Sequence, residues 1–373
     1  MELYTAVGVQ SNVFDCKYTI DSKADFTRNL KHLSHMIDVA VFHSMEYPVR
    51  LIALPEGAIQ GFPDEYHDWD PVAYSRDGAI DIPGPETDVL SEKAVKWNSY
   101  IIAQAKARMP EFPDRFFNIA FLIDPSGKII YQHRKNVVFS LEHTTTPHDV
   151  FDQWVAMFGD GLDAFFPVAR TPIGNIGSNI CMEGNFPEMA RGLALNGAEI
   201  IYRPSSAENK VSLGIWEIQN RARAIDNNCY VIAPNTGYIY LDDQQTQGFM
   251  TGGRSMIVDY RGQVLHINQQ AGDAFVGGPI CLDGLRQHRT QATHLNWLPH
   301  LKTEILQLIY RKAIWPKNLA EKEAPKRKDA IREIYYQTIK KLTNDGVFTK
   351  PTPSESPAQR RSVTEGNSPK RRR

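Results

Sequence analysis

Short hydrophobic runs alternate with longer stretches in which hydrophobic residues recur every three or four positions. The short runs are typical of strands, and the longer stretches are typical of amphipathic helices. Strands are predicted at Leu3–Gln10, Val49–Pro55, Ser99–Ala105, Phe117–Asp124, Lys128–Gln132, Ile173–Ile180, Ala198–Tyr202, Tyr230–Asn235, Gly253–Asp259, Gln263–Ile267 and Ala274–Leu282. Helices are predicted at Asp21–Ser44, Glu86–Trp97, Pro187–Asn196 and Leu213–Asn227. Such alternation of strands and helices predicts a layered α/β domain.

Two segments with turn residues each lie between two hydrophobic runs. Asp124-Pro125-Ser126-Gly127 and Asp259-Tyr260-Arg261-Gly262 both predict hairpins. They occupy comparable places in the first and second halves of the main domain, so a sandwich of two sheets is predicted rather than one open sheet.

The pattern changes after about Leu285. Amphipathic helices with charged outer faces are predicted at His300–Lys312 and Lys326–Leu342. We therefore expect a main domain at residues 1–285, a C-terminal helical arm at 286–349 that packs on the body or on a partner subunit, and a disordered basic tail at 350–373. The end of the tail, Ser368–Arg373, is interpreted as solvated, with a nuclear signal or a polyanion-binding patch as alternatives.

Composition narrows the class of protein. The chain has 373 residues, of which 42% are hydrophobic, and its formal charge of -1 excludes a binder of nucleic acid that relies on charge alone. The four cysteines include no Cys-x-x-Cys pair and are too few for a disulfide framework. The first residues lack the pattern of a secretory signal, and no run reaches the ~18 apolar residues of a membrane span. We therefore expect a soluble cytoplasmic protein.

Cys181 lies where a predicted strand meets a predicted helix. Asn185 and Glu188 resemble a capping box, with Pro187 in the first helical turn. A thiol at such a turn is exposed at the carboxyl end of a strand, and the helix N-terminus lowers its pKa. Cys181 is therefore a candidate nucleophile, and a buried, inert cysteine is the alternative.

A carboxylate offers a better base for this thiol than any histidine. Glu56 ends the apolar run Leu51–Pro55, and Lys135 follows the strand predicted at Lys128–Gln132. Because ligands in α/β proteins gather at the carboxyl ends of strands, Glu56, Lys135 and Cys181 are expected to converge. A metal site formed by Glu142, His143, His148 and Asp149 is an alternative, but its spacing matches no standard ligand pattern.

Three segments in order resemble the Glu–Lys–Cys signature of the nitrilase superfamily of carbon–nitrogen hydrolases. They are Leu54–Glu56 with Gly61-Phe62, His133–Lys135, and Asn179–Glu188. Further stretches that resemble this family are Ile82–Thr87, Arg221–Asn228 and Gly252–Asp259. The resemblance covers about residues 3 to 283 and leaves the C-terminal arm and tail outside it.

The resemblance implies a four-layer αββα sandwich and a homodimer or larger homo-oligomer. It also implies that Cys181 is the nucleophile, Glu56 the general base and Lys135 the oxyanion stabiliser, with no metal or organic cofactor. Glu142 is the candidate for a second, supporting glutamate, and a loop carboxylate without function is the alternative. The expected partners are a small amide or nitrile substrate and further copies of the chain.

The residues after Cys181 are closest to the aliphatic amidase and formamidase branch. This branch implies hydrolysis of a small carboxamide to a carboxylic acid and ammonia through a thioester. Phe139, Met182 and Glu183 are expected to contact the substrate, with the Met182 backbone N–H also stabilising the oxyanion. For Phe139, ordinary packing is the alternative.

Two features leave the function open. Met182 departs from the first acidic residue of the branch, and Gly57 replaces a bulkier aromatic residue, which predicts a larger acyl pocket. A nitrilase or an N-carbamoyl amidohydrolase is the alternative with the same three catalytic residues, and a catalytically retired scaffold that binds a partner is an alternative of another class.

Overall fold

The computed structural model describes residues 3–15, 26–44, 46–206, 211–242, 245–292 and 294–351. Contacts within the chain divide it into one unit that ends at Ile331 and a second that begins at Arg332. The tail predicted at 350–373 lies outside the described residues from position 352 onward. The extents predicted for the main domain, 1–285, and for the C-terminal arm, 286–349, stay predictions.

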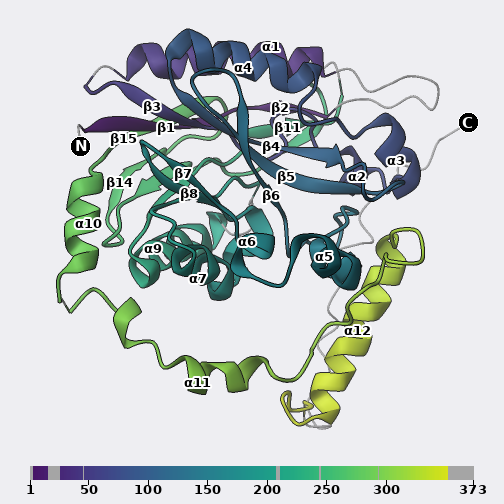
Figure 1. Ribbon diagram of the computed structural model, residues 1–373. Helices are drawn as coiled ribbons and strands as arrows, with labels where there is room; N and C mark the ends of the chain where they lie inside the picture. The colour runs from purple at the N-terminus through teal and green to yellow at the C-terminus, as the bar shows by residue number, and fades with distance from the viewer. Residues whose placement is uncertain are drawn as a thin grey trace, which may run out of the picture. The chain divides into compact units, whose positions relative to one another are not determined.

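Two six-stranded sheets form the centre of the first unit (Figure 1). In spatial order, the first sheet contains β15 (Ala274–Ile280), β1 (Tyr4–Gln10), β3 (Val49–Ala53), β4 (Tyr100–Arg108), β5 (Phe116–Ile123) and β6 (Ile129–Arg134). The second contains β14 (Val264–Ile267), β13 (Met256–Val258), β10 (Tyr230–Ala233), β9 (Ile200–Tyr202), β8 (Gly174–Ser178) and β7 (Val168–Thr171). A small third sheet contains β12 (Gly248–Met250), β11 (Tyr238–Tyr240) and β2 (Val13–Phe14).

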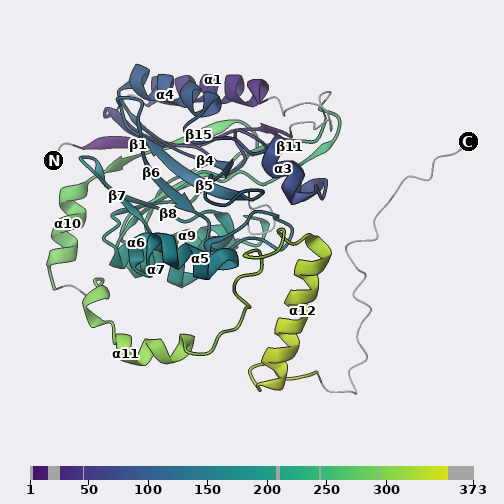
Figure 2. The ribbon, with the colours of Figure 1, turned by 45° about the vertical axis from the view of Figure 1, so that its right-hand side comes forward.

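Helices cover the outer face of each large sheet. Both ribbon views place α1 (Thr27–His43) and α4 (Pro85–Trp97) on one side, and α7 (Pro187–Leu195) and α9 (Ile215–Asn227) on the other (Figures 1 and 2). Three separate hydrophobic clusters fill the spaces between the layers: one under α1 and α4, one between the sheets and one under α7 and α9. These clusters define four layers in the order αββα, which confirms the predicted fold class.

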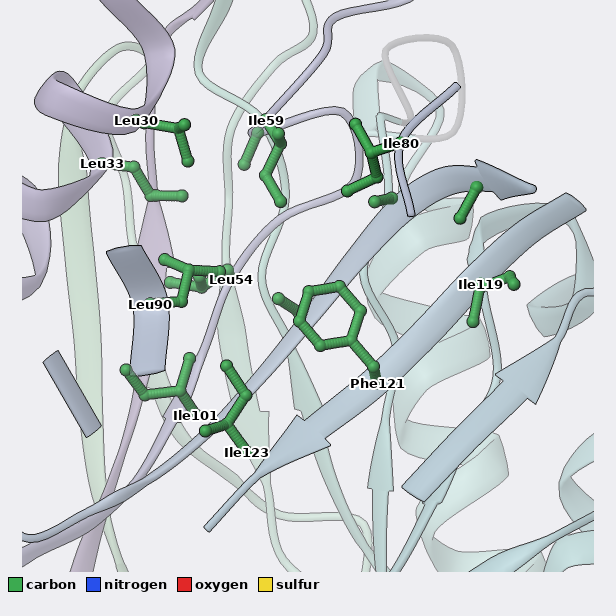
Figure 3. Close-up of a cluster of buried hydrophobic side chains, with 14 of the residues drawn as sticks. Leu30, Leu33, Leu54, Ile59, Ile80, Leu90, Ile101, Ile119, Phe121 and Ile123 are labelled. Carbon is green, nitrogen blue, oxygen red and sulfur yellow. The ribbon is translucent and has the colours of Figure 1, made fainter. Parts of the chain in front are cut away.

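Strand β5 shows how the sequence produces this layering. All eight of its side chains are buried. Ile119, Phe121 and Ile123 belong to the cluster under α1 and α4 (Figure 3). Ala120 and Leu122 belong to the cluster between the sheets. Because successive side chains of a strand alternate between its faces, a strand covered on both sides needs an apolar residue at almost every position.

Both predicted hairpins are present, at β5–β6 and at β13–β14. Each begins with an aspartate whose Oδ1 accepts backbone N–H groups within the turn, Asp124 in the first and Asp259 in the second. Gly127 and Gly262 close the turns with φ of 84° and 76°, which favour glycine. Each half of the domain therefore uses the same strand–turn–strand device.

The C-terminal arm differs from its prediction. The prediction of one helix at His300–Lys312 is wrong, because this segment contains only one α-helical turn and one 3-10 turn. Residues 302–314 are all exposed, and a short helix whose apolar stripe packs on nothing is marginal in water. The helix predicted at Lys326–Leu342 is confirmed as α12 (Lys328–Asn344).

Short elements account for the other differences. The strand predicted to reach Leu282 ends at Ile280, and the helix α10 (Leu282–Thr290) follows it. Elements of a single turn or two lack the repeated spacing by which a helix is recognised. The short helices that the sequence did not predict are α2 (Pro63–Tyr66), α3 (Pro71–Asp77), α5 (Phe151–Phe158) and α6 (Leu162–Phe165). The remaining helical turns are η1 (Pro147–Val150), η2 (Cys181–Asn185), η3 (Leu298–His300), α11 (Thr303–Leu306) and η4 (Gln307–Tyr310). No helix among the described residues is long and apolar enough to cross a membrane.

Candidate active site

Glu56, Lys135 and Glu142 form one buried hydrogen-bonded cluster. Glu56 follows β3 and Lys135 follows β6, so both lie at the carboxyl ends of strands in the same sheet. Lys135 Nζ donates to Glu56 Oε1 at 2.9 Å and to Glu142 Oε2 at 2.7 Å. Each of the three side chains is at most 4% exposed. The fold thus brings together three charged groups that lie far apart in the chain.

The charges in this cluster reinforce one another. Burial acts to lower the pKa of Lys135, but the charges of Glu142, Glu56 and Cys181 outweigh it and hold that pKa well above its ordinary value. Burial acts to raise the pKa of Glu142, but Lys135 and Lys106 outweigh it and lower the pKa to about 2. Lys135 and Glu142 are therefore both charged at neutral pH.

Asn118 holds the two carboxylates in place, and sequence reasoning missed it. Its side-chain amide donates to Glu56 Oε1 at 3.1 Å and to Glu142 Oε1 at 2.9 Å. Gln104 in turn donates to Asn118 Oδ1 at 2.8 Å, and Thr144 donates to Glu142 Oε1 at 2.7 Å. The signal that could have found Asn118 is its position as the sole polar residue in β5.

Glu56 and Lys135 each keep one hydrogen-bonding position that no described residue occupies. Both protein bonds to Glu56 end on Oε1, and no described residue donates to its Oε2. Lys135 uses two of the three N–H bonds of an ammonium, and the described residues accept no third. The cluster can therefore accept a proton at one atom and donate a hydrogen bond from another.

Cys181 lies at a strained turn beside this cluster. It begins η2 two residues after Asn179, which follows β8, and its φ of 42° lies in the left-handed region that side chains rarely adopt. Its backbone N–H donates to the Pro204 carbonyl at 2.8 Å. The side chain is partly buried and packs against the hydrophobic cluster between the sheets. Its charge contributes to the raised pKa of Lys135, so the sulfur lies within electrostatic range of the ammonium.

Glu183 connects the Cys181 turn to the segment that carries Lys135. Its side chain is 1% exposed. Its carboxylate accepts the backbone N–H of Ile180 at 2.7 Å and that of Asn136 at 2.8 Å, and it contacts His133 Nε2 at 3.0 Å. These contacts favour a positioning role for Glu183 over the substrate contact expected from the sequence.

The other two residues expected to contact substrate are more accessible. Phe139 is 45% exposed, and its carbonyl accepts the backbone N–H of Glu142 at 2.9 Å. Met182 is partly buried, and its sulfur contacts Asn185 Nδ2 at 2.9 Å. Their positions beside Glu142 and Cys181 leave both as proposed substrate contacts.

A second buried ion cluster lies next to the first. Lys106 Nζ contacts Asp64 Oδ1, and it contacts Glu65 Oε1 at 2.9 Å. Burial raises the pKa of Glu65 to about 8 against the opposing charge of Lys106, and the carboxylates of Asp64 and Glu142 add to the rise. Carboxylates thus outnumber ammonium groups around the site, and Lys106 helps to keep Glu142 ionised.

Gly57 has a structural reason other than the larger acyl pocket predicted for it. Its φ is 74°, and a Cβ built there would lie 2.4 Å from the Phe62 ring. Phe62 already fills the space that the missing side chain leaves. The larger acyl pocket stays a prediction.

Gly57→Ala is expected to lower the free energy of unfolding by about 1–3 kcal/mol, because it adds both backbone strain and a clash with Phe62. Urea denaturation would measure the loss. Gly214→Ala is the matched control, since its φ is 72° but no described residue lies within 4 Å of the added Cβ. Equal losses in the two variants would show that the Phe62 contact adds nothing.

The low pKa of Glu142 predicts an acid-dependent stability. A carboxylate whose pKa is about 2 in the folded chain and 4.5 ordinarily stabilises the fold above pH 4.5, and this contribution is lost as the pH falls toward 2. Thermal unfolding followed between pH 7 and pH 3 should therefore show a smaller fall in Tm for Glu142→Gln than for the wild type. Glu92→Gln, on the exposed side of α4, should follow the wild-type curve. Parallel curves for all three proteins would contradict the prediction.

The residues considered as an alternative metal site have other contacts. Glu142 belongs to the lysine cluster, His143 Nδ1 contacts a backbone carbonyl at 3.1 Å, and Asp149 accepts the N–H of Thr146 at 2.9 Å. Within the ranges that the structure describes, no group of three or more His, Cys, Asp and Glu side chains is placed to hold a metal ion.

Comparison with known proteins gives one consistent family. A model of the carbon–nitrogen hydrolase family matches residues 7–289. The chain is 33% identical over 204 residues to a probable hydrolase, nit2, of Schizosaccharomyces pombe, a match that covers 54% of this chain and 66% of the relative. It is 31% identical over 225 residues to a formamidase of Bacillus cereus, a match that covers 59% of each. The chain thus spans less than two thirds of the length of these relatives.

The fold is also similar to that of a solved structure. Saccharomyces cerevisiae Nit3, a member of branch 10 of the nitrilase superfamily, superposes with a TM-score of 0.59 at 20% identity, over 79% of this chain and 96% of that structure. The family model, which covers more than half of the chain, shows that the protein belongs to the carbon–nitrogen hydrolase family.

Proposed function

We propose that the protein is an amidase that hydrolyses a small carboxamide to a carboxylic acid and ammonia through a thioester on Cys181. Its family supports hydrolysis of a carbon–nitrogen bond, and the formamidase relative favours an amide as substrate. The observation that carries the proposal is the pair of open positions on Glu56 Oε2 and Lys135 Nζ beside a strained cysteine.

The first half of the reaction uses each position once. Glu56 Oε2 takes the thiol proton, and the Cys181 sulfur attacks the amide carbon, so that a C–S bond forms and the carbonyl π electrons move to oxygen. The third N–H of Lys135 stabilises this oxyanion, with the Met182 backbone N–H as the proposed second donor. When the intermediate collapses, the C–N bond breaks, Glu56 returns its proton to nitrogen, and ammonia leaves.

The second half regenerates the enzyme. Glu56 removes a proton from water, and the resulting oxygen nucleophile attacks the thioester carbon. The C–S bond then breaks, and Glu56 returns the proton to the sulfur, which restores the thiol and the carboxylate. Glu142 and Asn118 are proposed to hold Glu56 and Lys135 in place through both halves. Water is consumed once, and the chain supplies every group that these steps require.

An ammonia-release assay on a panel of substrates would test this function. The panel would contain amides of increasing acyl size, the matching nitriles and an N-carbamoyl amino acid. Amides are expected to react fastest. Faster turnover of nitriles would indicate a nitrilase, faster turnover of the carbamoyl compound would indicate an N-carbamoyl amidohydrolase, and no turnover of any compound would support a retired scaffold.

A homodimer or larger homo-oligomer remains the proposed assembly. The outer face of α9 exposes the large apolar side chains Ile215 and Ile218, and Leu195 is exposed at the end of α7. Burial of such a surface between copies would stabilise an oligomer. Light scattering on the full chain would give the mass, and a monomer would contradict this proposal.

A further inference from the structure

A buried arginine lies beneath the Cys181 turn. Arg203 follows β9, and its side chain is 0% exposed. Its two Nη atoms donate to neutral amide oxygens, of Asn220 and of Gln219, each at 2.8 Å. The guanidinium lies 4.9 Å from the centre of the Trp216 ring. Across the described residues, Arg203 forms no ion pair with any Asp or Glu.

The arginine packs directly against the turn that carries the cysteine. Ser178 pairs with Tyr202 in the parallel β8–β9 ladder, which places Arg203 one residue further along the neighbouring strand. A Cβ built at Gly184 would lie 1.9 Å from Arg203 Nε, so only glycine leaves room for the guanidinium there. That Nε is buried and has no hydrogen-bond partner.

A buried cation without a counter-ion is costly, so an anion nearby would offset that cost. Burial lowers the pKa of Arg203 to about 9, and Cys181 is the group that acts to raise it. The guanidinium therefore remains charged at neutral pH, and it lies close to Cys181, whose backbone N–H donates to the carbonyl of Pro204, the residue after Arg203, at 2.8 Å.

The other charged groups that surround the turn have partners or the wrong sign. Glu183 contacts His133 on one side, and Glu56 accepts from Lys135 on the other. Arg223, on the packed face of α9, repels Arg203 and so cannot serve as its counter-ion.

We propose that Arg203 stabilises the thiolate of Cys181 as a second, fixed cation beneath the nucleophile. It is a positioning residue, because it acts on the ionisation of the thiol rather than on the substrate. Lys135 is then free to act on the oxyanion. This inference rests on the proposed function only in taking Cys181 as the nucleophile.

Alkylation of Cys181 by iodoacetamide between pH 5 and pH 9.5 would test the proposal. Peptide mass spectrometry would give the rate at Cys181, and the exposed Cys281 would serve as an internal standard in the same molecule. Removing an opposite charge that lies close to a thiol should raise the thiol pKa by about one unit. In Arg203→Gln we expect alkylation of Cys181 at pH 6 to slow about tenfold while that of Cys281 is unchanged.

Two further variants make the test decisive. Gly184→Ala keeps every charge but pushes the guanidinium away from the turn, so it should shift the profile in the same direction even if Arg203→Gln does not fold. Arg223→Gln removes another buried arginine, which donates to the Asn185 carbonyl at 3.3 Å, and its profile should match the wild type. Unchanged profiles in both Arg203→Gln and Gly184→Ala, or an equal shift in Arg223→Gln, would overturn the proposal. Failure of the proposed function itself would appear separately, as amide hydrolysis by Cys181→Ala.

Discussion

Cys181→Ala is expected to lower kcat by on the order of 10⁶, the scale of loss when the nucleophile of a covalent hydrolase is removed. The reason is that, in the proposed mechanism, the thioester forms on this sulfur, and Glu56 and Lys135 cannot replace the attacking atom. Ammonia release would measure the loss, and intact-protein mass spectrometry of quenched reactions should show an acyl adduct on the wild type and none on the variant.

The matched control is Cys281→Ala, because Cys281 is an exposed thiol on the same chain. It should keep wild-type kcat and still show the acyl adduct. Cys181→Ala with more than about a hundredth of wild-type kcat would place the nucleophile elsewhere, since the expected loss is far larger.

Lys135→Met is expected to damage both activity and stability. Loss of the charge that stabilises the oxyanion should reduce kcat by about 10²–10³ or more. It also leaves Glu56 and Glu142 buried together without their cation, and breaking such a buried pair costs about 3–5 kcal/mol of unfolding free energy. Urea denaturation and ammonia release on the same preparation would measure the two effects.

A double variant separates these effects. Lys135→Met combined with Glu142→Gln removes one of the stranded charges, so it should recover part of the lost unfolding free energy while remaining as inactive as Lys135→Met. A single variant as stable as the wild type would mean that the buried charges are not coupled as their hydrogen bonds indicate.

The layered fold was predictable because its signals are local and repeated. Buried strands such as Phe116–Ile123 are apolar almost throughout, and both hairpins carry an aspartate and a glycine at fixed places in the turn. The arm was less predictable, since the apolar spacing of His300–Lys312 describes a helix only if something covers its stripe, and residues 302–314 are exposed in this chain.

The residues of the candidate site also differ in how far the sequence alone could predict them. Glu56 and Lys135 were visible because each is a charged residue just beyond the carboxyl end of a predicted strand. Asn118 was not, because its two carboxylate partners lie 62 and 24 residues away and nothing in the local sequence points to them. The structural reason for glycine at position 57 was not visible either, because the sequence does not show that the ring five residues later folds back over it.

The left-handed backbone at Cys181 sets stability against the proposed catalysis at a single position. Glycine would adopt a φ of 42° without the steric cost that a Cβ imposes there, a cost of order 1–3 kcal/mol. A library randomised at residue 181 and selected only for resistance to heat would therefore enrich glycine and discard the thiol. Directed evolution of this scaffold needs a selection for turnover in every round, because thermal selection alone would drive this codon toward an inert protein.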